Sequence, residues 1–176
     1  MATLGKQFMN KNKVRILSYI AGIIDGEGHI GIAKSSHPNT TRERTADYNL
    51  RVAVKMCDGK VIDYLFGNYN GHVGIRPAVP PRNKQYYWVL TCKKASELLK
   101  QLLPYLVGKK EQAELAIRFQ SKRKSGKKRD VIFDEWAYLS MKNLHKTYHE
   151  CAAASTKHNE LPMAISDSQI LQESKL

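Results

Sequence analysis

Residues 19–30 have the sequence YIAGIIDGEGHI, in which hydrophobic positions flank an Ala-Gly pair and precede an Asp-Gly-Glu-Gly run. From residue 15 onward, apolar side chains recur at the three- and four-residue spacing that is typical of a helix with one buried side. Gly26 and Gly28 favour termination, because glycine adopts the backbone conformation that ends a helix at low cost. The pattern predicts a helix over residues 15–25 that ends beside the carboxylate of Glu27.

Alternating apolar and polar residues follow this helix and predict antiparallel strands. We expect one strand pair from residues 30–33 and 47–56, a short helix over 60–69, and a second strand pair from residues 73–78 and 85–92. The period then becomes helical again, over residues 95–103, 109–120 and 133–151, with Trp136, Leu139 and Leu144 as the predicted core residues of the last helix. This order of elements indicates the α+β class.

Composition limits the function classes that remain. The chain has 176 residues and a formal net charge of +13, which favours a polyanionic partner such as nucleic acid. No apolar run approaches the roughly 20 residues of a membrane span, so we expect no membrane association. Three separated cysteines argue against a disulfide framework and fit a reducing interior, in an organelle, a nucleus or a prokaryotic cytoplasm. We expect a flexible arm over residues 1–12, one domain over 13–153 and a polar tail over 154–176.

The motif over residues 19–28 resembles that of the LAGLIDADG homing endonucleases, and residues 104–113 resemble the segment that carries their active-site lysine. The order αββαββα also matches that family's fold. The resemblance implies an antiparallel four-stranded saddle sheet with helices on one face, followed by C-terminal helices. It further implies an intron-encoded, site-specific endonuclease that hydrolyses double-stranded DNA with Mg²⁺ at a long pseudo-palindromic target.

The chain contains one copy of this motif, so two chains are needed to bring two Glu27 carboxylates together in a homodimer. Gly22 and Gly26 are four residues apart and lack bulk, which lets two helices approach closely. The resemblance implies that Asp25 caps and orients the partner helix. The predicted interface comprises Tyr19, Ala21, Gly22, Ile23 and Asp25.

Carbonyl groups at the helix end and the Glu27 carboxylate attract a divalent cation, and hard oxygen ligands suit Mg²⁺. The resemblance implies that Gly26 and Glu27 hold Mg²⁺, or Mn²⁺, at the dimer axis, where the metal activates water. Lys109 matches the family lysine and is assigned an electrostatic role in catalysis. Met56 stands where the family often has a polar residue. We assign that role to Lys60, with Lys55 as the alternative.

The open face of the sheet is the predicted DNA surface, because antiparallel sheets can cover one face and present the other. Arg51 and Arg76 are the candidates for guanine contact, and Asn49 the candidate for adenine contact. The DNA-binding residues predicted from strand parity, strand tips and the basic loop are His29, Gly31, Ala33, Ser35, His37, Arg42, Arg44, Asn49, Arg51, Lys55, Arg76, Arg82, Lys84, Tyr86, Trp88, Lys122, Arg123, Lys124, Lys127, Lys128 and Arg129.

Two other functions fit the same pattern. An RNA-binding, intron-splicing maturase would need the basic surface and not Glu27, and nuclease and maturase activities can coexist in one chain. A DNA-binding regulator that has lost cleavage would need neither Glu27 nor Lys109. The presence of both residues favours the nuclease, because a pure binder gains nothing from a carboxylate directed at phosphate.

Overall fold

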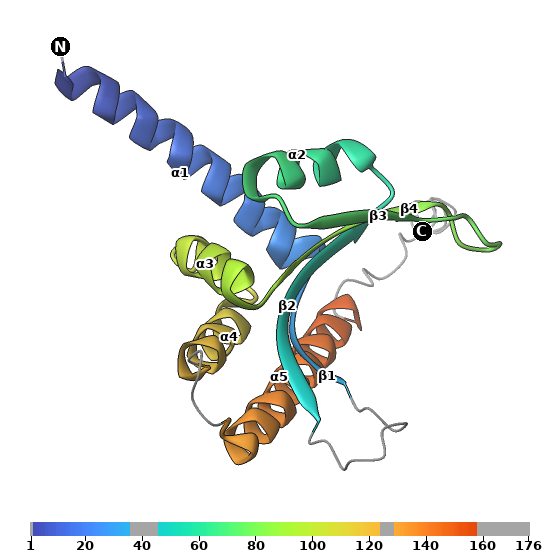
Figure 1. Cartoon of the computed structure of the whole chain (residues 1–176). Helices are drawn as coiled ribbons and strands as arrows, with labels where there is room; N and C mark the ends of the chain where they lie inside the picture. The colour runs from blue at the N-terminus through green and yellow to red at the C-terminus, as the bar shows by residue number, and fades with distance from the viewer. Residues whose placement is uncertain (1, 36–45, 124–128, 158–176) are drawn as a thin grey trace, which may run out of the picture. The chain divides into compact units, whose positions relative to one another are not determined.

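The computed structural model describes residues 2–35, 46–123 and 129–157 and confirms the α+β class (Figure 1). Its elements are α1 (Ala2–Glu27), β1 (Gly28–Ser35), β2 (Asp47–Met56), α2 (Gly59–Tyr69), β3 (His72–Arg76), β4 (Gln85–Thr91), α3 (Cys92–Leu102), α4 (Lys110–Lys122) and α5 (Val131–Lys157). The chain divides into two compact units, Met1–Leu144 and His145–Leu176. The sheet, its hydrophobic core and the cleft beside Glu27 lie in the first unit. Within the described ranges, no helix has the length and apolar character that a membrane crossing requires.

The four strands form one antiparallel sheet, as predicted, and their order in it is β1-β2-β4-β3. Gly28 at the start of β1 pairs with Val54, and Val54 pairs in turn with Trp88. On the far side of β4, Trp88 pairs with Val73. Because paired residues share a face, this register decides which side chains lie on each side of the sheet.

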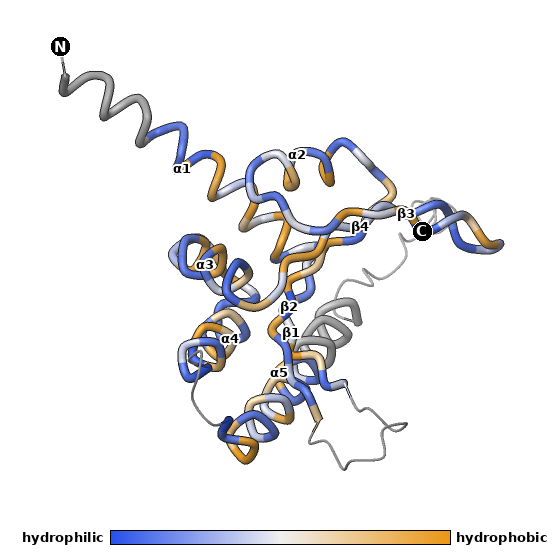
Figure 2. Tube along the Cα trace, viewed as in Figure 1, coloured by the Kyte–Doolittle hydropathy of each residue, from blue (hydrophilic) through white to orange (hydrophobic). Residues whose placement is uncertain are grey.

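Helices cover one face of this sheet and build the core of the unit. In β2, Tyr48, Leu50, Val52 and Val54 point into that core and are at most 2% exposed. The helices contribute Ile20 and Ile24 from α1, Ile62 and Leu65 from α2, Leu98 and Leu99 from α3, Ala116 and Phe119 from α4, and Ala137 and Met141 from α5. Figure 2 shows hydrophobic and hydrophilic residues alternating around α3 and α4, as expected of helices with one buried side.

Two expectations about the helices differ from the structure. Helix α1 begins at Ala2, so it runs through most of the segment that we predicted as an arm. In α5, the prediction of Trp136 and Leu139 as core residues was wrong, since these side chains are 45% and 49% exposed. Among the residues described in this helix, the buried hydrophobic ones are Ala137 and Met141. The Trp136 ring instead lies on the surface under the Arg118 guanidinium, 5.4 Å away.

Candidate active site and nucleic-acid interface

The C-terminal end of α1 is bonded to the segment that precedes α4. The Asp25 carboxylate accepts hydrogen bonds from the backbone amides of Val107 and Lys109 at 2.8 and 2.9 Å. In the other direction, the Lys109 ammonium donates to the main-chain oxygens of Ile24 at 2.9 Å and Asp25 at 2.6 Å. The last turn of α1 therefore has donors for its exposed carbonyls, and its position is fixed relative to α4.

Lys109 is a buried cation, with only 7% of its surface exposed. Burial lowers the pKa of its ammonium group, while the nearby carboxylates of Asp25 and Glu27 act in the opposite direction. The positive charge lies where the dipole of α1 is negative, which stabilises both groups. The Lys109 ammonium group thus lies at the helix end that carries Glu27. Its electrostatic role in catalysis stays a prediction.

Gly28 connects α1 to β1 in a space that admits no side chain. A β-carbon at this position would lie 2.6 Å from the main-chain oxygen of Ile24. The chain can therefore turn directly from the helix into the strand only with glycine here. This turn places the exposed Glu27 at the edge of the sheet, next to His29 at the start of β1.

A cleft of about 330 Å³ opens on the uncovered face of the sheet beside Glu27. Its charged and titratable lining residues are Glu27, His29, Arg51, Lys55 and Arg76, which come from α1, β1, β2 and β3. Three cations from the strands thus line the same cleft as one carboxylate. The arrangement suits a phosphate-bearing ligand that approaches a metal-binding carboxylate.

Most of the predicted DNA-facing residues lie on this uncovered face. The register places His29, Ala33, Ser35, Asn49, Arg51, Lys55 and Arg76 there, and all are exposed. Gly31 shares the face but is buried, because the His29 ring lies over it.

Tyr86 and Trp88 were predicted on the wrong face. Trp88 is 0% exposed and lies on the helix-covered side with Val54, where its indole nitrogen donates to the main-chain oxygen of Asn70 at 2.5 Å. Both faces of β4 carry large apolar or aromatic side chains, so alternation alone could not assign them. The register places Tyr87, rather than Tyr86, on the uncovered face, paired with Lys55.

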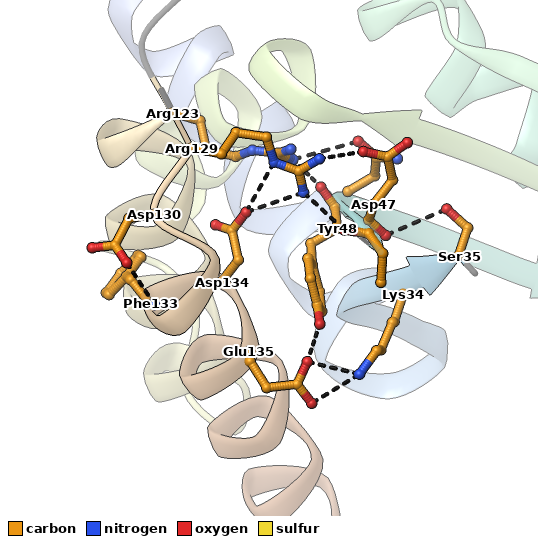
Figure 3. A network of polar contacts seen from close by, with 12 residues as sticks. Lys34, Ser35, Asp47, Tyr48, Arg123, Arg129, Asp130, Phe133, Asp134 and Glu135 are labelled. Carbon is orange, nitrogen blue, oxygen red and sulfur yellow. Dashed lines mark hydrogen bonds and ion pairs between the residues drawn. The ribbon is translucent and has the colours of Figure 1, made fainter. Parts of the chain in front are cut away.

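The remaining predicted DNA contacts comprise His37, predicted from strand parity to face the major groove, and the residues of the strand tips and the basic loop. They fall into three groups. His37, Arg42, Arg44, Lys124, Lys127 and Lys128 lie outside the described residues. Arg82, Lys84 and Lys122 are exposed. Arg123 and Arg129 instead bond within the chain: Arg123 donates to the main-chain oxygen of Tyr48, and Arg129 donates to the carboxylates of Asp47 and Asp134 (Figure 3).

Lys60 does not lie in the cleft that contains Glu27. It is exposed at the start of α2, where its backbone amide donates to the Asp58 carboxylate at 2.8 Å and caps the helix. Its side chain lines a different hollow with Arg15, Tyr19 and Tyr64. Lys55, our alternative, lines the cleft with Glu27 and is the better placed of the two lysines.

The predicted dimer surface on α1 is exposed in part. Tyr19 is 51% exposed, and a β-carbon on Gly22 or Gly26 would meet nothing within 4 Å. Ala21 was wrongly included, because it is 0% exposed and packs in the subunit's own core. Asp25 is bonded to the Val107 and Lys109 amides of its own chain.

Sequence reasoning missed Asp47 on the uncovered face and three basic or titratable residues of a second hollow. Asp47 pairs with Ser35 and shares the face with Asn49 and Arg51, so the parity used for those two residues would have included it. His72, Lys93 and Lys94 line a second hollow of about 770 Å³ at the end of β4. Lys93 and Lys94 fall at a helix start that the apolar pattern predicted too late, at residue 95.

Among the described residues, no group of three or more His, Cys, Asp or Glu side chains lies close enough together to hold an ion. Glu27 is the carboxylate that lines the cleft beside the sheet. A hard oxygen ligand of this kind fits Mg²⁺, which keeps several waters and takes further oxygens from a bound phosphate.

The sequence matches no protein-family model and no curated protein. Solved structures are similar in fold. The homing endonuclease I-CvuI, in complex with the I-CreI target in the presence of Mg, has a TM-score of 0.62 and 16% identity over 76% of this chain and 83% of that chain. I-CvuI with its own target and Ca has a TM-score of 0.61, with 17% identity over 82% and 96% of the two chains.

A third solved structure agrees with these two. The homing endonuclease I-TnaI has a TM-score of 0.52 and 15% identity, over 76% of this chain and 96% of that chain. These likenesses show that the chain has the fold of the homing endonucleases that its motif resembles.

Proposed function

We propose that this protein is a site-specific DNA endonuclease of the homing type, encoded within an intron. It binds double-stranded DNA as a homodimer and hydrolyses one phosphodiester bond in each strand with Mg²⁺ or Mn²⁺. One observation carries the proposal: the Glu27 carboxylate lines the same cleft as Arg51, Lys55 and Arg76 on the uncovered face of the sheet. A carboxylate directed at phosphate would repel the DNA backbone unless a divalent cation lay between them.

The uncovered face supports recognition of a base sequence. It presents Asn49, Arg51 and Arg76 from strands that together fit the width of a major groove. Arginine can pair with guanine and asparagine with adenine, each through two hydrogen bonds. Two identical subunits would read two identical half-sites, so the expected target is long and pseudo-palindromic.

The exposed side of α1 supports the homodimer. Ser18, Tyr19, Gly22 and Gly26 recur at three- and four-residue spacing and are all exposed. Two helices can pack closely along the small residues of this set, Ser18, Gly22 and Gly26. Pairing of the α1 helices would bring both Glu27 residues to the dimer axis, with Lys109 behind each helix end.

The metal supplies a Lewis acid that activates water and stabilises charge on the attacking and leaving oxygens. Glu27 and the Gly26 carbonyl would hold it. Lys109 bonds the carbonyls of Ile24 and Asp25, so those two oxygens are already used, and Glu27 is left as the charged ligand at this helix end. Lys55, within the cleft, would offset negative charge on the phosphate.

Selection of cleaved sites from a randomised duplex library, with Mg²⁺ present, tests the whole proposal. We expect cleavage of sequences with two related half-sites and a short stagger between the cuts. The control is Glu27→Gln, which should bind without cutting, and Glu97→Gln is the matched change of an exposed carboxylate on α3.

Specific binding without cleavage by the wild-type protein, in either Mg²⁺ or Mn²⁺, would contradict the nuclease and favour a DNA-binding regulator. Absence of duplex binding, together with binding to a structured intron RNA, would favour a maturase.

A further inference from the structure

Asp47 is an acidic residue on the uncovered face of the sheet, where the other charged strand side chains are cationic. It begins β2, pairs with Ser35, and shares the uncovered face with Asn49 and Arg51. Among the described strand residues of this face, Asp47 is the only acidic one. Its side chain is 47% exposed, so it stays partly accessible to a ligand.

An exposed carboxylate opposes a polyanion, and its ion pair with Arg129 offsets only part of that repulsion, since the side chain stays partly exposed. The major groove offers such a contact, because cytosine presents its N4 amino group as a hydrogen-bond donor and carboxylates accept from it. DNA phosphates offer only hydrogen-bond acceptors, so the Asp47 carboxylate cannot contact the DNA backbone through a direct hydrogen bond.

The Asp47 carboxylate is held in one orientation by Arg129. Arg129 Nη1 donates to Asp47 Oδ1, and Nη2 donates to the main-chain oxygen of Ala46 at 3.2 Å. Behind it, Nη2 and Nε donate to Asp134 Oδ2 at 3.2 and 3.4 Å, and the Asp134 side chain is 4% exposed. The guanidinium is therefore fixed by a buried carboxylate on α5 and cannot swing away cheaply (Figure 3).

A second set of bonds attaches the same end of the sheet to α5. Lys34 Nζ donates to both Glu135 oxygens at 2.9 and 2.7 Å, and Tyr48 donates to Glu135 Oε2 (Figure 3). The ends of β1 and β2 beside Asp47 are thus both bonded to α5. A base contact needs this rigidity, because a hydrogen bond discriminates between bases only when its acceptor is positioned in advance.

We propose that Asp47 is a specificity-determining residue that accepts a hydrogen bond from cytosine N4 once in each half-site, and that Arg129 is its positioning residue. A carboxylate has about four acceptor positions, so the bond from Arg129 orients the group and still permits a base contact. The inference rests on the proposed DNA binding. To the proposed DNA binding it adds the identity of one base in each half-site and the two residues, Asp47 and Arg129, that select this base.

Selection of bound, rather than cleaved, duplexes from a randomised library tests the inference with the full-length chain. We expect the wild-type protein to select a C·G pair at one symmetric outer position. Asp47→Ala and Asp47→Asn should each lower the preference for cytosine there by about tenfold and leave the other positions unchanged. Glu97→Gln, which removes a remote exposed charge, is the matched control and should change no position.

Arg129→Gln should weaken the preference at that same position, and Arg129→Lys should keep part of it. Arg118→Gln, which removes an exposed charge from α4, is the control. A purely structural role for Arg129 would lower the thermal unfolding midpoint without changing the base preference.

An unchanged profile in both Asp47 variants, or tighter binding to all sequences alike, would overturn the inference and leave the proposed function standing. A wild-type protein that selects no sequence would overturn both.

Discussion

The side-chain nitrogen of Lys109 lies 2.6 Å from the main-chain oxygen of Asp25, and the Asp25 carboxylate lies 2.9 Å from the backbone nitrogen of Lys109. The two residues, 84 positions apart in sequence, thus bond each other in both directions. The helix end that presents Glu27 depends on this pair for its position.

Replacing the buried lysine tests that dependence. Lys109→Met should lower the free energy of unfolding by about 1–3 kcal/mol, because two carbonyls at the end of α1 lose their donor. Denaturation with urea measures the change. Lys110→Met, at the exposed neighbouring position, is the control and should lie within about 0.5 kcal/mol of wild type. Equal stability of the two variants would contradict a structural role for the Lys109 ammonium.

The same residue predicts a pH dependence. Burial lowers the pKa of Lys109 in the folded chain below the ordinary value of 10.5, which applies to the unfolded chain. At a pH between the folded-state pKa and 10.5, the unfolded chain therefore binds more protons than the folded chain. The stability contributed by this group therefore rises with pH across that window. The difference in unfolding free energy between wild type and Lys109→Met should increase as the pH approaches 10.5. A difference that falls over this range would show that folding raises the pKa instead.

Glu27→Gln should reduce cleavage by at least about a hundredfold, because the neutral amide is a weak ligand for a divalent metal. Duplex affinity measured without divalent metal should stay equal to wild type or increase slightly, since one negative charge leaves the cleft. Gel-shift and single-turnover cleavage assays separate the two effects. Cleavage at the wild-type rate would remove Glu27 from the active site.

Gly22→Leu should separate the proposed dimer. A β-carbon at Gly22 meets nothing within 4 Å in the subunit, and leucine favours the helix, so the monomer should remain folded. Sedimentation equilibrium should report monomers, with loss of both specific binding and cleavage. Gly67→Leu makes the same change at another open helical glycine, on α2, and should leave the assembly intact. A Gly22→Leu protein that remains an active dimer would place the interface elsewhere.

Lys55 and Lys60 are predicted to differ in their effect on cleavage. Lys55 lines the cleft with Glu27, whereas Lys60 lines a hollow beside Tyr19 and Tyr64. Lys55→Ala should therefore slow cleavage by about tenfold under single-turnover conditions, and Lys60→Ala should change it less than twofold. A larger loss of cleavage in Lys60→Ala than in Lys55→Ala would contradict this prediction and favour our first assignment of Lys60 to the active site.

Local sequence patterns predicted much of this architecture. The spacing of Ile20, Ile23 and Ile24 predicted the helix, and the strict alternation in residues 47–56 predicted the longest strand and its buried face. These predictions succeed because a helix or a half-buried strand repeats its environment every 3.6 or every 2 residues, and the repeat is visible without knowledge of the neighbours. Alternation failed in β4, where Tyr86, Tyr87 and Trp88 suit either face and the pairing with β2 decided between them.

By itself, the sequence determined the α+β class, the position of Glu27 at a helix end and the basic character of the open strand face. The tertiary structure alone decided which charges are neutralised and which remain available. Lys109 bonds the end of α1, Arg129 bonds Asp47 and Asp134, and Lys55 rather than Lys60 joins Glu27. The reason is physical: a pattern along the chain reports the side on which a residue lies, but the partner of a charge comes from another element, and only folding sets that distance.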